Sequence, residues 1–99
     1  SGGYWIASSA DRIFAAPTTL TGSIGVVGGK MVIDGLSDKI GLNWERIEWG
    51  QNAGIWSMSK PFTASESERM NAMLDHVYEA FKDRVAKGRK MDSKVVEKI

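Results

Sequence analysis

The chain has 99 residues, enough for one small domain, and 42% apolar with 25% charged residues is the composition of an ordinary globular protein. Thirteen basic and twelve acidic residues leave a formal charge of +1, which argues against nucleic acid as a partner. Without cysteine, disulfides and thiolate metal sites are excluded.

The two ends suggest a piece of a longer protein. No apolar run reaches the roughly 18 residues of a membrane-spanning helix, and the start lacks the features of a secretory signal. The sequence opens on Ser-Gly-Gly without a methionine and stops inside a helical pattern. We therefore expect residues 1–99 to be a single partial domain, truncated at both ends, and whether the parent is anchored in a membrane stays open.

Short apolar runs separated by turn residues fill the first third of the chain. Gly2–Ala10 mixes small and large apolar residues, which predicts a buried helix packed against a sheet. Arg12–Ala16 is a short apolar run that ends at Pro17, as a buried strand does before a turn. Ser23–Val27 and Met31–Ile33 are also apolar and β-branched, and predict two brief strands or one interrupted strand.

The middle of the chain predicts one short helix, one strand and a loop. Asp34–Ile40 has apolar residues four apart, and Gly41 follows where a left-handed cap residue is expected. Asn43–Trp49 has the aromatic and β-branched character of a strand. Gln51–Phe62 has no sustained period and predicts a surface loop.

The last third gives the clearest local pattern. Thr63 and Glu66 form a capping box, and an apolar stripe then predicts a long helix over Ala64–Lys87 that Gly88 ends. A cap at residue 92 or 93 starts a further helix. Short strands alternating with helices, with a long helix near the C-terminus, predict an α/β fold whose sheet is only partly present.

Two short motifs could carry chemistry. Ser1 precedes two glycines at the mouth of a helix, where backbone N–H groups favour developing negative charge, so it could be a nucleophile with the Gly2 N–H as an oxyanion donor. The alternative is that Ser1 only caps the helix. Thr21 and Ser23 lie in a glycine-flanked turn and could orient a catalytic base, although such hydroxyls often bond their own backbone.

Taken together, these motifs and their spacing resemble the signal peptide peptidase A family, also called protease IV. The resemblance covers nearly the whole chain and is densest in Ser-Gly-Gly-Tyr-Trp-Ile, Ala-Asp-Arg-Ile, Pro17 and Leu-Thr-Gly-Ser-Ile-Gly-Val. It implies a ClpP/crotonase-like α/β fold and a Ser/Lys dyad. On this basis Ser1 is the nucleophile, Ser23 orients the lysine base and Gly2 gives an oxyanion N–H.

The sequence departs from the short members of this family at the lysine. The matching stretch reads Gln-Asn-Ala-Gly, with Ala53 at the expected position, and Lys60, the next lysine along the chain, has no supporting motif. Two explanations are open: the C-terminal repeat of a long form whose lysine comes from the N-terminal repeat, which we favour, or a chain that has lost its lysine. In either case the isolated chain is expected to be inactive.

The remaining polar residues have ordinary explanations. His76 is the only histidine and is expected to be partly solvated, and no metal site or cofactor is expected. Glu66 and Glu68 suit the first turn of a helix. Trp56, in the loop, is either a core or interface anchor or a wall of an apolar cleft that binds the substrate.

The resemblance implies a serine endopeptidase that degrades cleaved signal peptides. Its expected partners are these peptides, the rest of the parent chain or a neighbouring subunit that supplies the lysine, and further copies in a homo-oligomer, but no nucleic acid. Association with the bacterial inner membrane is implied, with the catalytic part outside the cytoplasm. The alternatives are a crotonase-like acyl-CoA enzyme, an inactive scaffold repeat of the same fold, and an enzyme that uses the Ser1 α-amino group as its base.

Overall fold

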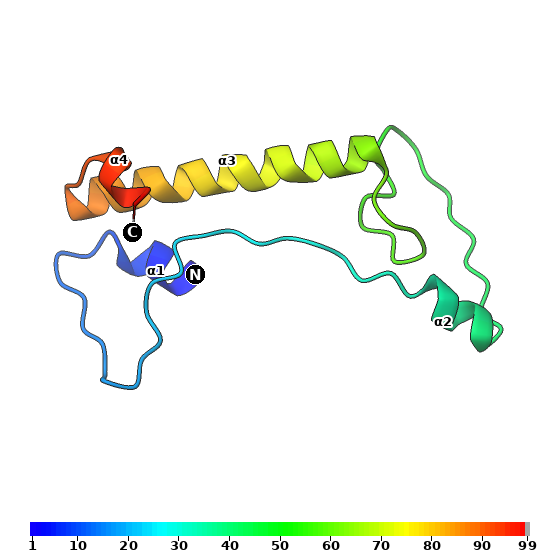
Figure 1. Ribbon diagram of the computed structural model, residues 1–99, viewed down its shortest axis with the longest axis horizontal. Helices are drawn as coiled ribbons and strands as arrows, with labels where there is room; N and C mark the ends of the chain where they lie inside the picture. Colours follow the sequence, from blue (N-terminus) through cyan, green and yellow to red (C-terminus); the bar gives the residue numbers. More distant parts are fainter. Residues whose placement is uncertain (99) are drawn as a thin grey trace. The chain divides into compact units, whose positions relative to one another are not determined.

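The structure is a computed structural model that describes residues 1–98, and Figure 1 shows its elements. Within those residues the helices are α1 (Gly2–Ala7), α2 (Asp34–Lys39), α3 (Ala64–Arg89) and α4 (Ser93–Val96). The chain divides into two compact units. Unit 1 combines residues 1–27 with residues from 74 onward, and unit 2 comprises residues 28–73.

The predicted α/β fold with alternating strands is wrong for the described residues, because residues 1–98 contain helices and no strand. A strand needs a neighbour with which its backbone groups pair. In unit 2 the Ile33 N–H donates to the Met58 carbonyl oxygen (2.8 Å), but no ladder continues from it within the described residues. The segments that were expected to be strands are Arg12–Ala16, Ser23–Val27, Met31–Ile33 and Asn43–Trp49.

The core of unit 1 forms around the second half of α3. Phe81 and Val85 are buried on the apolar stripe of α3, and Val96 of α4 is buried against them. Trp5 of α1 stacks on Phe81, with ring centroids 4.6 Å apart, and Ile24 packs at the edge of the cluster. The predicted long helix is confirmed, and its stripe is what brings α1 and α4 together.

Close packing in unit 1 fixes the end of α1. This helix stops at Ala7, earlier than the predicted Ala10, and the hydroxyls of Ser8 and Ser9 bond back to carbonyl oxygens three residues earlier, at 2.9 and 3.0 Å. A Cβ at Gly88 would meet the backbone of Ser8. Gly88 therefore permits close approach and does not end α3 as predicted; the left-handed residue after the helix is Lys90, with φ of 53°.

Unit 2 holds the predicted capping box. The Thr63 N–H donates to Glu66 (2.8 Å) and the Glu66 N–H donates to the Thr63 hydroxyl (3.2 Å), so two free donors at the start of α3 are satisfied. The short helix α2 is also confirmed, and Gly41 follows it with φ of 72°. The Trp44 indole N–H donates to the buried Ser37 hydroxyl of α2 at 2.9 Å, which ties the next segment to this helix.

In the part of the chain that the structure describes, no helix combines the length and the apolar character needed to cross a membrane.

Candidate active site

Ser1 is the N-cap of α1 in unit 1. Its hydroxyl oxygen accepts a hydrogen bond from the Tyr4 N–H at 3.3 Å. The N–H groups of Gly2 and Gly3 belong to the first turn, where a helix offers them no acceptor. Ser1 and both glycines are exposed, and no atom lies within 4 Å of the place where a Cβ on Gly2 would sit. The hydroxyl and the free N–H of Gly2 thus share one open end of the helix.

The second motif meets the first through the backbone. The Ser1 α-ammonium nitrogen donates to the Ser23 carbonyl oxygen, although 22 positions separate the two residues. Gly22 and Ser23 have positive φ angles, 88° and 56°, and these left-handed conformations form the turn that presents the Ser23 carbonyl. The Ser23 residue is exposed. Sequence reasoning paired these two serines by resemblance, and the structure brings their backbones together.

An open hollow lies beside Ser1 in unit 1. Its volume is about 230 Å³, and its lining includes the Ser1 residue together with the apolar side chains of Tyr4, Ile13 and Leu20. Leu20 is 99% exposed and comes from the segment just before the Gly22–Ser23 turn. A peptide placed in this hollow would lie next to the hydroxyl and expose its apolar side chains to an apolar lining.

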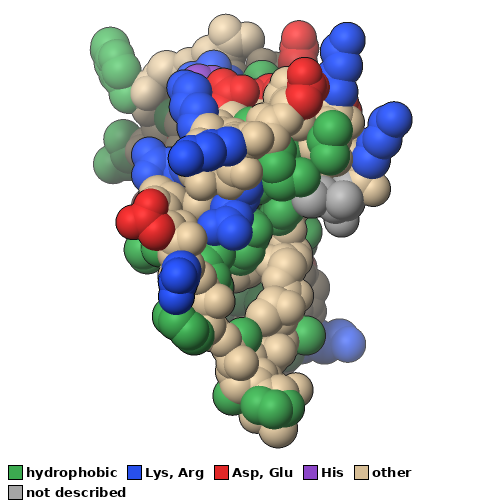
Figure 2. Space-filling view, turned by 90° about the vertical axis from the view of Figure 1, so that its left-hand side faces the viewer, with side chains coloured by type: hydrophobic (Ala, Val, Ile, Leu, Met, Phe, Trp, Pro, Cys, Tyr) green, Lys and Arg blue, Asp and Glu red, His purple; other side chains and the backbone are tan. Residues whose placement is uncertain are grey.

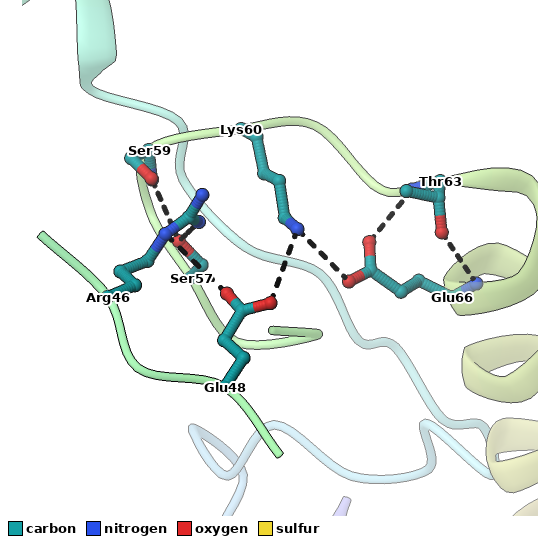
Figure 3. A network of polar contacts seen from close by, with 7 residues as sticks. All are labelled: Arg46, Glu48, Ser57, Ser59, Lys60, Thr63 and Glu66. Carbon is teal, nitrogen blue, oxygen red and sulfur yellow. Dashed lines mark hydrogen bonds and ion pairs between the residues drawn. The ribbon is translucent and has the colours of Figure 1, made fainter. Parts of the chain in front are cut away.

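Two of the three lysines of unit 2, Lys30 and Lys60, make contacts within that unit. The Lys60 amine lies 3.7 Å from Glu48 and 4.0 Å from Glu66, as Figure 3 shows. The Lys30 amine is buried without a hydrogen-bond partner among the described residues and lies 4.4 Å from the centre of the Phe62 ring. Ala53, at the position expected for the family lysine, is exposed in a run of turns. The partners of both amines, Glu48, Glu66 and Phe62, belong to unit 2 as well.

A polar network surrounds Lys60, and no local sequence pattern predicts it. The Arg46 guanidinium lies 3.5 Å from Glu48 and donates to the Ser57 hydroxyl, which is 3.0 Å from the Ser59 hydroxyl (Figure 3). Its members lie up to 20 positions apart, and only the Thr63–Glu66 pair has a recognisable spacing. The network joins the start of α3 to the preceding loops of unit 2.

Electrostatics at the start of α3 favour an ionised Glu66. The hydrogen bond from the Thr63 backbone N–H lowers the pKa of Glu66, burial opposes this, and the charges of Lys60 and Lys30 lower the pKa further. The residue is only 3% exposed. Glu66 is thus a structural carboxylate, as its place in the capping box predicts.

Two other predicted residues, Trp56 and His76, are absent from the lining of the hollow beside Ser1. Trp56 belongs to unit 2 and is 58% exposed, and it is not among the residues that line this hollow. Its predicted contact with substrate stays a prediction. His76 is exposed on α3, and the described residues contain no group of three or more His, Cys, Asp or Glu side chains that could hold a metal ion.

Comparisons with known proteins identify a matching family and several related proteins. The model of peptidase family S49 matches residues 1–99. The chain is 37% identical to "Serine protease SPPA, chloroplastic" of Arabidopsis thaliana, 34% identical to "Protease 4" of Salmonella typhi and 33% identical to "Putative signal peptide peptidase SppA" of Enterococcus faecium. Each match covers all of this chain but only 15%, 16% and 29% of the respective relative.

Proposed function

Because the chain belongs to peptidase family S49, which confirms the predicted resemblance, we propose that it supplies the nucleophile of a serine endopeptidase. The proposed substrates are cleaved signal peptides, and the proposed catalytic pair is Ser1 with a lysine. The lysine comes from the rest of the parent chain or from a neighbouring subunit of a homo-oligomer. The parent is associated with the bacterial inner membrane, with its catalytic part outside the cytoplasm.

The observation that carries the proposal is the contact between the backbones of Ser1 and Ser23. A catalytic base is oriented by a third group, and the family resemblance implies that the Ser23 hydroxyl orients the lysine amine in this way. The contact keeps the Ser23 residue beside Ser1. A Ser1 that served only as a helix cap would not require this distant turn.

The proposed chemistry begins with the Ser1 hydroxyl. Its oxygen bonds to the carbonyl carbon of the scissile peptide while the lysine amine takes its proton. The Gly2 N–H donates to the oxyanion that forms, an interaction typically worth about 3 kcal/mol. The C–N bond then breaks, the lysine returns the proton to the leaving amine, and water hydrolyses the acyl ester.

The contacts of Lys30 and Lys60, two of the three lysines of unit 2, support a base from outside residues 1–99. Lys60 is paired with Glu48 and Glu66, and a paired ammonium has no free lone pair to accept a proton. Lys30 lies against Phe62. A base from outside these residues also explains why Ala53 is tolerated at the position of the family lysine.

The lining of the hollow beside Ser1 supports an apolar peptide substrate. Tyr4, Ile13 and Leu20 present apolar surface there, and the core of a signal peptide is a run of roughly 7–15 apolar residues. Trp56 remains a proposed apolar contact for the substrate on the family resemblance and its sequence context alone.

The proposal is tested by peptide cleavage with the protein at its natural length. The variants are Ser1→Asn, which keeps a good N-cap residue but removes the nucleophile, and Ser23→Ala. Ser9→Ala, which removes an exposed hydroxyl at the other end of α1, is the matched control. We expect no cleavage with Ser1→Asn, a loss of about 100-fold or more with Ser23→Ala, which disturbs the base, and normal cleavage with Ser9→Ala.

Replacing each lysine outside residues 1–99 in turn then locates the base. One replacement should abolish cleavage while the protein stays folded. Cleavage that survives Ser1→Asn would refute the proposed nucleophile. A folded wild-type protein that cleaves no apolar peptide would instead favour the scaffold or acyl-CoA alternatives.

A further inference from the structure

Charge is unevenly distributed along this nearly neutral chain. Residues 84–98 hold six basic and two acidic residues, a net charge of +4, whereas residues 1–83 hold seven basic and ten acidic residues, a net charge of −3. The six cations, here called the basic end, lie on the last turns of α3, on α4 and beside it. They are Arg84, Lys87, Arg89, Lys90, Lys94 and Lys98.

The two carboxylates in this stretch are already occupied. Asp92 caps α4 and accepts a hydrogen bond from the Lys94 N–H at 2.8 Å. Glu97 pairs with Lys82, which lies outside the basic end, at 3.5 Å. Neither carboxylate pairs with a side chain of the basic end. The exposed Asp83 lines the same hollow as Arg84 and Lys87, but no ion pair joins it to either among the described residues.

The lysines of the basic end are free. Lys87, Lys90, Lys94 and Lys98 are exposed, and none of them pairs with a carboxylate among the described residues. The two arginines have other contacts: Arg84 lies 5.8 Å from the Trp5 ring centre, and Arg89 donates to the Ala10 carbonyl oxygen at 3.2 Å. Figure 2 shows this end of unit 1, with Lys and Arg side chains prominent on its upper part.

The make-up of the basic end favours a lipid surface over nucleic acid. Clusters of four to eight Lys or Arg residues on a helix are typical of binding to anionic lipid. Lysine is a flexible point charge, suited to a diffuse anionic surface, whereas nucleic acid is bound through arginine forks and stacked aromatic rings. Four of the six cations are lysines, and no aromatic residue occurs in residues 84–98. Val95, between two of the lysines, adds an apolar side chain that is 46% exposed.

We propose that the basic end binds the surface of membranes that contain anionic phospholipid. Attraction between the four free lysines and the lipid headgroups holds unit 1 at the surface, without insertion of a helix. The proposal is independent of the peptidase activity, because none of these side chains belongs to the candidate site at Ser1.

The test is flotation of the 99-residue chain with vesicles of phosphatidylcholine containing about one third phosphatidylglycerol, because bound chain rises with the vesicles whereas self-associated chain does not. The variant K87Q/K90Q/K94Q should bind about 100-fold more weakly, because each lysine near an anionic surface contributes about fivefold. The matched control is R12Q/K39Q/R69Q, which removes the same charge from exposed residues elsewhere and should bind within about threefold of wild type. Circular dichroism checks that each variant is folded.

Salt and lipid composition give the second readout. Binding should be lost at 0.5 M salt, where charges are screened beyond roughly 4 Å, and on vesicles of phosphatidylcholine alone. Equal loss with both triple variants, or salt-resistant binding to neutral vesicles, would overturn the proposal. Tighter binding to a single-stranded oligonucleotide than to the anionic vesicles, at the same salt, would also overturn it. Because the readout is binding, failure here leaves the proposed peptidase function untouched.

Discussion

Gly88 is packed against the backbone of Ser8 and Ser9, so there is no room for a side chain at this position. A Cβ at this position would meet the carbonyl oxygen of Ser8 and lie 3.1 Å from the Ser9 Cα. Alanine favours a helix over glycine by about 1 kcal/mol, but backbone atoms cannot move aside cheaply. We expect Gly88→Ala to lower the free energy of unfolding by about 1–3 kcal/mol in chemical denaturation.

The control for this prediction is Gly35→Ala in α2. No atom lies within 4 Å of the Cβ that this change adds, so alanine should be neutral or stabilise by up to about 1 kcal/mol. Gly88→Ala behaving like Gly35→Ala would contradict the close contact between α1 and α3.

Because Glu66 is ionisable, the stability that the capping box gives to α3 depends on pH. Its pKa is lowered, chiefly by the hydrogen bond from the Thr63 N–H, so the ionised carboxylate stabilises the folded state. This stabilisation is complete above the ordinary value of 4.5 and is lost as the pH falls through the lower pKa of the folded state. Glu66→Gln should therefore lower the melting temperature at pH 7, and the difference from wild type should shrink below pH 4.5.

Melting curves of wild type, Glu66→Gln and Glu68→Gln between pH 7 and pH 2.5 would measure this effect. Glu68 is exposed on the same helix and controls for the loss of one negative charge. A constant difference between wild type and Glu66→Gln over the whole range would show that its charge does not stabilise the fold.

At the scale of elements, the second half of α3 organises unit 1. Phe81 is 1% exposed and contacts Trp5 of α1, while Val85 and Val96 complete the buried cluster. Phe81→Ala should lower the free energy of unfolding by about 3–5 kcal/mol, because it removes buried apolar surface and leaves a cavity. Phe14→Ala, at a side chain that is 88% exposed, should change it by less than about 0.5 kcal/mol. Similar losses in denaturant titrations of the two variants would place the core elsewhere.

The helices were predictable because their signals are local. The capping box and apolar stripe of α3, the glycine after α2 and the Asp92 cap of α4 all lie within a few residues of the elements they define. The strand predictions were wrong, because a strand forms only when a distant segment pairs with it, and no short sequence pattern specifies that partner. Many of their apolar residues are exposed, such as Val27 at 98%, although Ile24 packs at the edge of the unit 1 core.

The candidate site was predictable only in part. The helix capped by Ser1 followed from local sequence, and the Ser23 turn was linked to it by family resemblance, since no short pattern relates positions 22 apart. The close approach at Gly88 and the Lys60 network depend on tertiary packing, and no local pattern predicts either of them.

At the scale of the whole molecule, exposed apolar surface is extensive. Large apolar residues at least 88% exposed occur in both units, among them Phe14, Leu20, Ile47 and Trp49. Surface of this kind marks contact sites or drives association. We expect the 99-residue chain to self-associate, with a sedimentation coefficient that rises with concentration. A strictly monomeric profile at high concentration would contradict this prediction.

The central claim is that Ser1 is the nucleophile, and mapping a covalent adduct tests it most directly. The active protein at its natural length is treated with a fluorophosphonate, which bonds to activated serine hydroxyls, and digested for mass spectrometry. We predict that the adduct lies on Ser1, and that Ser1→Asn abolishes labelling while Ser9→Ala does not. An adduct on another serine, or an active preparation with no adduct, would contradict the account.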